Sequence, residues 1–149
     1  MSPFIWPVRV YYEDTDAGGV VYYANYLKFM ERARTEWLRS LGIEQEPLLR
    51  EDNVMFVVAD MEAKFRRPAR FGELLEVTSE VAESRRASIT FAQEIWRGGA
   101  GAGELLLSGR VRVACLDART FRPRSLPDRL APECLSQVDR AERLLRETP

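Results

Sequence analysis

The sequence predicts an α+β fold in which a curved antiparallel sheet of about five strands wraps around one long central α-helix. Three observations predict it. Apolar side chains recur every three or four positions between residues 25 and 41, which is helical spacing. Four later segments alternate apolar and polar residues, which is strand spacing. The links between those segments are short, and short links favour antiparallel pairing.

The N-terminal third is predicted to contain a strand, a turn and the helix. Phe4–Tyr12 is the predicted strand, and its two prolines favour an edge position or irregular structure at its start. Glu13–Gly19 is turn-like, being rich in Asp and Gly. The predicted helix, Asn25–Leu41, carries an apolar stripe of Tyr26, Met30, Ala33, Trp37 and Leu41, widened by Leu27, Phe29 and Leu38. Asn25 is a candidate N-cap, with a helix start one turn earlier, near Tyr22, as the alternative. Gly42 suits the left-handed position after the helix.

The rest of the chain is predicted to form a short helix and four long strands. The helix covers Glu44–Arg50, and the strands cover Met55–Arg67, Leu74–Ser84, Ser88–Trp96 and Leu105–Leu116. The first of these strands is long enough to bend. The glycine-rich run Gly98–Gly103 is typical of a hairpin loop, because it lacks the Lys-Ser/Thr pair of a phosphate loop. We expect one domain over residues 1–149, with a helical C-terminal tail over about residues 128–149.

Composition excludes several classes of function. The 149 residues are 46% hydrophobic and 30% charged, as in ordinary globular domains. Lys+Arg 22 against Asp+Glu 23 leaves a net charge of −1, so no basic field favours nucleic acid. The sequence has no run of about 18 apolar residues, which a transmembrane helix would need, and the N-terminus lacks a signal-peptide pattern. We therefore expect a cytoplasmic protein.

The absence of histidine is the most restrictive feature of the composition. It excludes Ser-His-Asp and Cys-His catalysis within one chain, and also a His-ligated zinc site. Acid–base chemistry must therefore use carboxylate, tyrosine, cysteine, lysine or solvent. The cysteines, Cys115 and Cys134, form no CxxC motif, and Cys115 lies in an apolar run that predicts burial.

An acidic cluster lies between the predicted first strand and the long helix. Asp16 is followed closely by Gly18 and Gly19, which allow close approach of the backbone to a ligand. A carboxylate beside a helix N-terminus can act while backbone N–H groups polarise a carbonyl oxygen. Capping of a helix or turn is the commoner role of such an Asp, and spacing alone leaves both interpretations open. We expect Glu13 and Asp14 to be turn or solvent-facing carboxylates.

The run Tyr11–Tyr23 (YYEDTDAGGVVYY), with Ala24-Asn25-Tyr26 and Glu31-Arg32-Ala33-Arg34 after it, resembles the 4-hydroxybenzoyl-CoA thioesterase family and its Tol–Pal-associated acyl-CoA thioesterase branch. Weaker likeness continues through residues 65–70, 85–88 and 123–127. The resemblance implies a hot-dog fold and hydrolysis of acyl-CoA thioesters without metal or cofactor. It also implies a homo-oligomer, dimer or tetramer, with its site between subunits.

The resemblance also implies roles for individual residues. Asp16 would attack the thioester carbonyl or activate a water, and the Tyr23 N–H would form the oxyanion hole. The Tol–Pal branch usually has histidine where this chain has Tyr23, so Tyr23 would act through its backbone, and the substrate stays open. Substrate contacts are expected from Gly18, Gly19, Val20, Tyr22, Tyr26, Arg67, Arg85, Arg86 and Ser88. The candidates for an acyl pocket are Tyr22, Tyr26, Trp37 and Phe56, with core packing favoured for Trp37.

Two other functions are compatible with the same fold. One is a binding module for acyl-CoA or acyl carrier protein, with weak or no hydrolysis. The other is enoyl hydratase chemistry, which normally pairs a histidine with its aspartate, so the absence of histidine counts against it. Thioester turnover distinguishes the hydrolase from the binding module.

Overall fold

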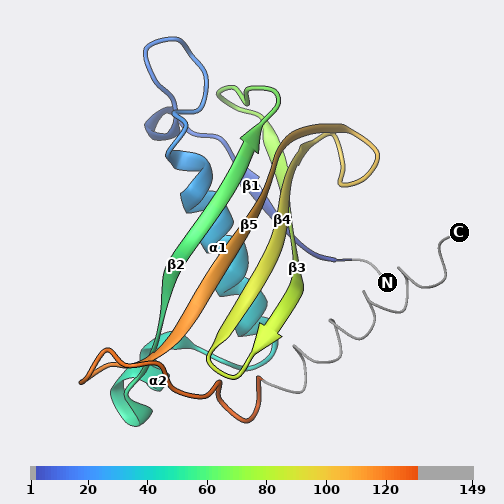
Figure 1. The fold of residues 1–149 in the computed structure, drawn as a ribbon. Helices are drawn as coiled ribbons and strands as arrows, with labels where there is room; N and C mark the ends of the chain where they lie inside the picture. Colours follow the sequence, from blue (N-terminus) through green and yellow to red (C-terminus); the bar gives the residue numbers. More distant parts are fainter. Residues whose placement is uncertain (1–2, 131–149) are drawn as a thin grey trace, which may run out of the picture.

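The computed structural model describes residues 3–130, which form five strands, two α-helices and one 3-10 turn (Figure 1). In chain order these are β1 (Phe4–Arg9), the 3-10 turn (Tyr12–Asp14), α1 (Asn25–Ser40), α2 (Gln45–Asp52), β2 (Val54–Phe65), β3 (Leu74–Arg85), β4 (Ser88–Arg97) and β5 (Glu104–Asp117). The predicted C-terminal tail lies almost entirely outside the described residues.

The five strands make one antiparallel sheet in the order β1-β3-β4-β5-β2. The sheet curves around α1, which lies against its concave face (Figure 1). A register shift between Val58 and Asp60 bends β2, as its length predicted. The predicted α+β architecture of a sheet around one helix is therefore confirmed. β1 and β2 are the two edges, and Pro7 lies on the β1 edge.

The predicted first strand is too long. β1 ends at Arg9, opposite Leu74, because Leu74 is the first residue of its partner β3. The chain then leaves the sheet, and the N–H of Asp14 donates to the carbonyl of Tyr11 in the 3-10 turn. Three residues, 10–12, therefore separate the strand from the acidic cluster, where the pattern predicted none.

The helix α1 packs its apolar stripe onto the sheet, with Phe29, Met30 and Ala33 fully buried. Trp37 is a core residue, as favoured, and meets Phe91 edge to face at 5.3 Å between ring centroids. Leu27 is the exception to the predicted stripe, because it is 37% exposed.

The sequence predicted the residue after the C-terminal end of α1 correctly, but not the cap at its N-terminal end. Gly42 has a φ of 78°, so the predicted left-handed residue after the helix is confirmed. The prediction of Asn25 as N-cap is wrong, because Ala24 is the cap residue and Asn25 is the first helical residue. The Asn25 side chain bonds instead to Asp14, 3.0 Å away.

A buried glutamine connects α1 to the middle of the sheet. Gln93 on β4 is 1% exposed. Its Nε2 donates to the Met30 carbonyl at 3.0 Å and to the Ser79 hydroxyl at 2.9 Å. Its Oε1 accepts a hydrogen bond from Arg34 at 3.0 Å. All the polar atoms of this buried side chain are thus paired, as a buried amide requires.

Cys115 is fully buried on β5, as its apolar run predicted. Burial raises the pKa of its thiol, which makes it a structural rather than a reactive cysteine. Among residues 3–130, no helix combines the length and the apolar character needed to cross a membrane.

Candidate active site

The residues between β1 and α1 form a compact hairpin, which we call the acid turn (residues 14–22). Thr15 and Val21 face each other in an isolated antiparallel bridge. The N–H of Asp16 donates to the carbonyl of Val20 at 2.9 Å. The turn is also attached to the β2–β3 loop, because the Val21 N–H donates to the Ala69 carbonyl at 2.9 Å. The position of Asp16 is therefore set by backbone hydrogen bonds on both sides.

Asp16 lies at the exposed tip of the acid turn. Its Oδ1 accepts the N–H of Gly18 at 2.8 Å, while Oδ2 accepts no hydrogen bond from residues 3–130. A Cβ at Gly18 would lie 3.1 Å from that Oδ1, so glycine permits the close approach. Gly19, with φ of 80°, and Val20, paired with Arg70, complete the turn. Asp16 thus has one oxygen held by the protein and one open to a ligand.

Two backbone N–H groups remain open where the acid turn enters α1. The N–H of Tyr22 donates to the Asp14 carbonyl, and that of Asn25 donates to the Tyr22 carbonyl. The two N–H groups between them, of Tyr23 and Ala24, have no hydrogen-bond acceptor among residues 3–130. Free N–H groups at the positive end of a helix attract a developing negative charge.

Three tyrosines surround the helix start in different environments. The rings of Tyr22 and Tyr23 are both exposed, with centroids 4.9 Å apart. A hydrogen bond that the Tyr22 hydroxyl donates to Tyr23 raises the pKa of Tyr22, because it favours the protonated form. Tyr26 is buried, and its hydroxyl accepts the N–H of Ala69 at 2.9 Å. Burial, partly offset by that hydrogen bond, raises the pKa of Tyr26, and the negative charge of Asp16 is a small further contribution.

Of the two roles expected for Asp14, a turn carboxylate or a solvent-facing one, the first is confirmed, since Asp14 lies in the 3-10 turn and its side chain is only 4% exposed. Its Oδ2 accepts the N–H of Tyr11 at 2.9 Å, and its Oδ1 accepts Nδ2 of Asn25. The two aspartates of the motif therefore have opposite environments. Asp14 lies inside the protein with its oxygens paired, and Asp16 lies outside with one oxygen free.

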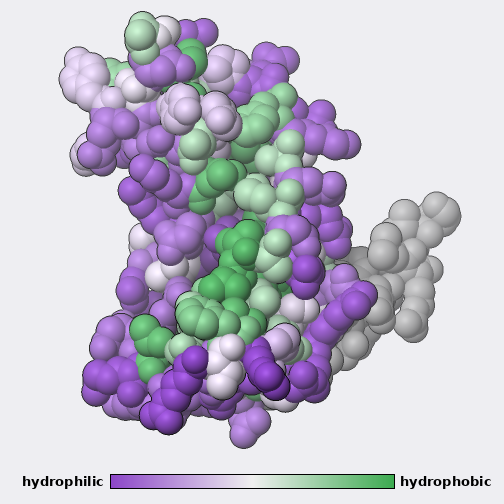
Figure 2. Space-filling view, turned by 60° about the vertical axis from the view of Figure 1, so that its left-hand side comes forward, coloured by the Kyte–Doolittle hydropathy of each residue, from purple (hydrophilic) through white to green (hydrophobic). Residues whose placement is uncertain are grey.

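A groove starts one helical turn after Tyr23 and runs along α1, between the helix and β2. Figure 2 shows a hydrophobic band on this face of the molecule. One part of the groove is lined by Leu27 and Met61 and encloses about 340 Å³. A second part of about 120 Å³ lies further along the helix. Glu31, Arg34 and Val58 line both parts, which makes them neighbours in one groove.

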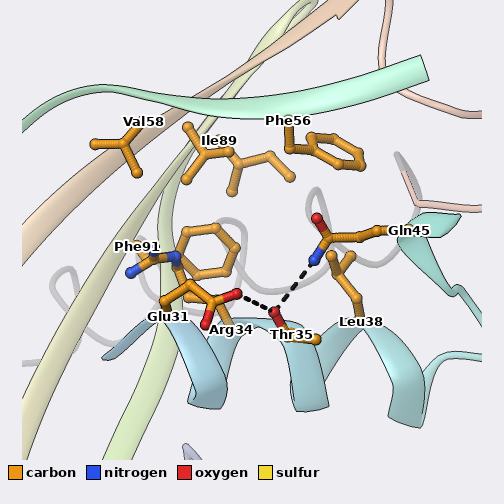
Figure 3. Close-up of a pocket in the computed structure, with 10 residues that line it drawn as sticks. Glu31, Arg34, Thr35, Leu38, Gln45, Phe56, Val58, Ile89 and Phe91 are labelled. Carbon is orange, nitrogen blue, oxygen red and sulfur yellow. Dashed lines mark hydrogen bonds between the residues drawn. The ribbon is translucent and has the colours of Figure 1, made fainter. Parts of the chain in front are cut away.

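The second part of the groove has an apolar wall and a polar wall (Figure 3). Phe56, Val58 and Ile89 reach in from the sheet. The polar side chains come from the helices, where the Thr35 hydroxyl donates to Glu31 and accepts from Gln45. Burial lowers the pKa of Arg34, whose guanidinium is held by Gln93. Such a groove suits an apolar chain. Of the four candidates from the sequence, Phe56 lines it, whereas Tyr22, Tyr26 and Trp37 do not.

The candidate arginines lie at both ends of the molecule. Arg67 lies near the acid turn, on the loop after β2, and pairs with Glu104 at 3.2 Å. Arg85, Arg86 and Ser88 lie at the β3–β4 hairpin, at the other end of α1 (Figure 1). β3 starts beside the acid turn, and Arg85 is roughly 36 Å further along at about 3.3 Å per residue. One copy of the chain therefore does not bring these three residues to Asp16.

Sequence reasoning missed three features of this region: the burial of Asp14, its bond to Asn25, and the groove that begins at Leu27. One signal was present for the first two. Asn is a weak helix former, so Asn25 inside the first turn indicates a side-chain partner. No local signal marks Leu27, because an apolar residue at helical spacing ordinarily predicts core packing.

Comparisons with known proteins place the chain in a family. A model described as the thioesterase superfamily matches residues 18–103. A protein of Escherichia coli O6:H1 named acyl-CoA thioester hydrolase YbgC is 45% identical over 130 residues, covering 87% of this chain and 94% of the relative. A Haemophilus influenzae protein named acyl-CoA thioesterase YbgC is 47% identical over 125 residues, covering 83% and 88% respectively.

Solved structures agree with this placement. The crystal structure of a probable thioesterase from Bartonella henselae superposes with a TM-score of 0.73 at 34% identity, covering 85% of this chain and all of the other. A 1,4-dihydroxy-2-naphthoyl-CoA thioesterase from Synechocystis, at 22% identity, shares the fold with a TM-score of 0.81, covering 89% and 95%. With its sheet around one helix and its motif-bearing turn, the chain has the hot-dog fold and belongs to the thioesterase superfamily of enzymes.

Proposed function

We propose that this protein hydrolyses acyl-CoA thioesters to a carboxylic acid and coenzyme A, with Asp16 as the catalytic carboxylate. The observation that carries the proposal is that two groups in one short segment are both open to a ligand. Asp16 has a free Oδ2, and the N–H of Tyr23 has no acceptor among the described residues. The names of relatives at 45% and 47% identity support the acyl-CoA class of substrate.

The proposed reaction needs one carboxylate and one oxyanion site. The thioester oxygen accepts the Tyr23 N–H, which stabilises the negative charge that develops there. As a general base, Asp16 takes a proton from water, the water oxygen attacks the carbonyl carbon, and the C–S bond breaks. The proton from Asp16 then goes to the CoA thiolate. As a nucleophile, Asp16 instead forms a mixed anhydride, which water hydrolyses after the thiolate has left.

The groove between α1 and β2 supplies a site for the acyl group in this proposal. Its first part begins at Leu27, one turn after the proposed oxyanion site. An acyl chain that enters there contacts Met61 and Val58 and reaches the second part beside Phe56. Gly18, Gly19, Val20 and Tyr22 surround the thioester end. The buried hydroxyl of Tyr26 is already bonded to Ala69, which favours a supporting role for that residue.

We also propose that the working form is a homo-oligomer, dimer or tetramer, with the site between subunits. The outer edge of β2 pairs with no strand among residues 3–130, and an unpaired edge beside an apolar groove favours association. A second copy is also needed to bring Arg85, Arg86 or Ser88 to the nucleotide of a CoA bound at Asp16. Arg67 is already at that end. Light scattering during gel filtration measures the mass, and a monomer at micromolar concentration would contradict this proposal.

The deciding experiment measures thiol release from acyl-CoA esters of increasing chain length, with benzoyl- and hydroxybenzoyl-CoA, by the wild type and Asp16→Asn. Asn keeps an oxygen for the Gly18 N–H, so the turn is preserved. We expect kcat to fall by roughly a thousandfold, within the range for a lost general base. Glu13→Gln is the matched control, because it removes an exposed carboxylate from the adjacent 3-10 turn and should leave kcat unchanged.

The outcomes separate the candidate functions. Unchanged turnover in Asp16→Asn would refute the mechanism. A wild type that binds acyl-CoA or acyl carrier protein but hydrolyses no thioester would favour the binding module. A single turnover in ¹⁸O-labelled water separates the two roles of Asp16. If Asp16 is the nucleophile and water attacks its carboxyl carbon in the anhydride, ¹⁸O remains in Asp16. If Asp16 is the general base, it gains no ¹⁸O.

A further inference from the structure

The buried pair Asp14 and Asn25 has no part in the chemistry proposed above, although it flanks in sequence the two groups that do. Asp14 is 4% exposed and Asn25 is 8% exposed, so neither side chain is placed to touch a substrate. Burial of a carboxylate is costly unless its oxygens are hydrogen-bonded. Here Oδ1 accepts Nδ2 of Asn25 at 3.0 Å, and Oδ2 accepts the N–H of Tyr11 at 2.9 Å.

These bonds join three parts of the chain that are separate in sequence. Tyr11 follows β1, Asn25 is the first residue of α1, and Asp14 lies at the start of the acid turn. The side chain of Asp14 therefore connects the exit of the strand to the entrance of the helix. The segment enclosed by this connection, residues 15–24, contains both Asp16, at its tip, and Tyr23.

The main chain of Asp14 also decides which amide stays open. Its carbonyl accepts the N–H of Tyr22 at 2.9 Å, while the next N–H, of Tyr23, has no acceptor among residues 3–130. Asn25 is not needed as a cap, since Ala24 holds that position. A polar side chain at the first helical position is thus explained by its bond to Asp14 alone.

We propose that Asp14 and Asn25 are positioning residues, which hold the acid turn against the helix start and so set the Asp16 carboxylate relative to the Tyr23 N–H. This inference rests on the proposed hydrolysis. Misplacement of a catalytic group by about 1 Å can lower a rate roughly a hundredfold. Loss of the pair therefore lowers kcat and changes KM little, because the groove that receives the acyl group lies outside the turn that the pair holds.

The test is a charge swap between the two positions. Asn25→Asp places two buried carboxylates against each other, which repels them or forces them to share a proton. Adding Asp14→Asn to that variant restores every bond, since the new amide keeps an oxygen for the Tyr11 N–H and donates to the new carboxylate. Asp14→Asn alone should have the smallest effect of the three variants. The Asn25 amide can rotate so that its oxygen accepts a hydrogen bond from the new amide.

We expect Asn25→Asp to lower kcat roughly a hundredfold with KM changed less than about threefold, and the double variant to recover to within about tenfold of wild type. Compared with wild type at the same pH, the single variant also recovers part of its loss at acid pH, where one shared proton removes the repulsion. All rates are divided by the folded fraction from circular dichroism. If Asn25→Asp does not fold, Asn25→Ala, which removes only the donor, replaces it with an expected loss of about tenfold.

Three results would overturn the positioning role: unchanged kcat in Asn25→Asp, a loss that follows the folded fraction alone, or a double variant no better than the single. For Asn25→Ala, an unchanged kcat overturns it as well. Failure of the proposed function looks different, since Asp16→Asn would then match the wild type or the wild type would release no thiol. If the wild type is active, Asp16→Asn abolishes that activity and substitution of Asn25 leaves kcat unchanged, only the positioning role is refuted.

Discussion

Two polar regions contact α1, and they differ in how completely their groups are paired. Under the middle of the helix, Gln93 uses both ends of its amide, bonding Arg34, Ser79 and the Met30 carbonyl. At the start of the helix, Asp16 keeps one oxygen free and the Tyr23 N–H has no acceptor among residues 3–130. A fully paired network stabilises a structure, whereas open groups at a helix start are available to a substrate.

This contrast predicts that the two regions fail in different ways. Changes to the Gln93 network should lower the free energy of unfolding with a smaller effect on kcat. Changes at Asp16 should lower kcat and leave unfolding nearly unaffected, because Asp16 is exposed. The acid turn contains both behaviours, since Asp14 is paired and buried like Gln93.

The largest effect on stability is expected from Gln93→Met, which keeps most of the side-chain volume but removes all three bonds. Arg34 and the buried Ser79 then lose their partner, and unfolding free energy should fall by about 2–4 kcal/mol. Denaturant titration measures the loss. Ser79→Ala removes one of the bonds and should cost about 1 kcal/mol. A drop in kcat as deep as that of Asp16→Asn would contradict the contrast.

A smaller effect is expected from Tyr26→Phe, which leaves the buried N–H of Ala69 without its acceptor and should cost about 1–2 kcal/mol. Since burial raises the pKa of Tyr26, the folded protein retains a proton that the unfolded chain releases above about pH 10. The contribution of Tyr26 to stability is therefore complete below that pH and declines as pH rises through the raised pKa.

The variant lacks this titration, so the difference in stability between wild type and Tyr26→Phe should shrink above about pH 10. Unfolding by urea at pH 8 and at pH 10.5 checks it. A difference that stays constant between the two conditions would mean that the folded state does not hold the Tyr26 proton more tightly.

The smallest effect is expected from Gly18→Ala. A Cβ there lies 3.1 Å from Oδ1 of Asp16, so the carboxylate must move by a few tenths of an ångström. We expect kcat to fall by a factor of about three to ten, and thermal unfolding to stay the same because Gly18 is exposed. An unchanged kcat would show that the position of Oδ1 does not matter to the reaction.

The sequence by itself determined the elements and the part of the chain in which the chemistry lies. Helical spacing located α1, with its C-terminal glycine, and alternation located the four long strands, because these periods follow from the local geometry of the backbone. The lack of histidine and the motif around Asp16 directed attention to the acid turn. The periodicities and the motif are each contained within a short stretch of chain, and the lack of histidine follows from composition.

Only the tertiary structure decided which polar groups are paired and which are open. Tyr26 meets Ala69 across 43 positions, and Gln93 meets Arg34 across 59. The order of strands left one edge of β2 unpaired within residues 3–130, and the groove beside it left Leu27 exposed against its pattern. Asp14 and Asp16 lie two positions apart in the motif, yet Asp14 is buried and Asp16 is exposed. Burial depends on contacts with distant residues, and local periodicity carries no information about those contacts.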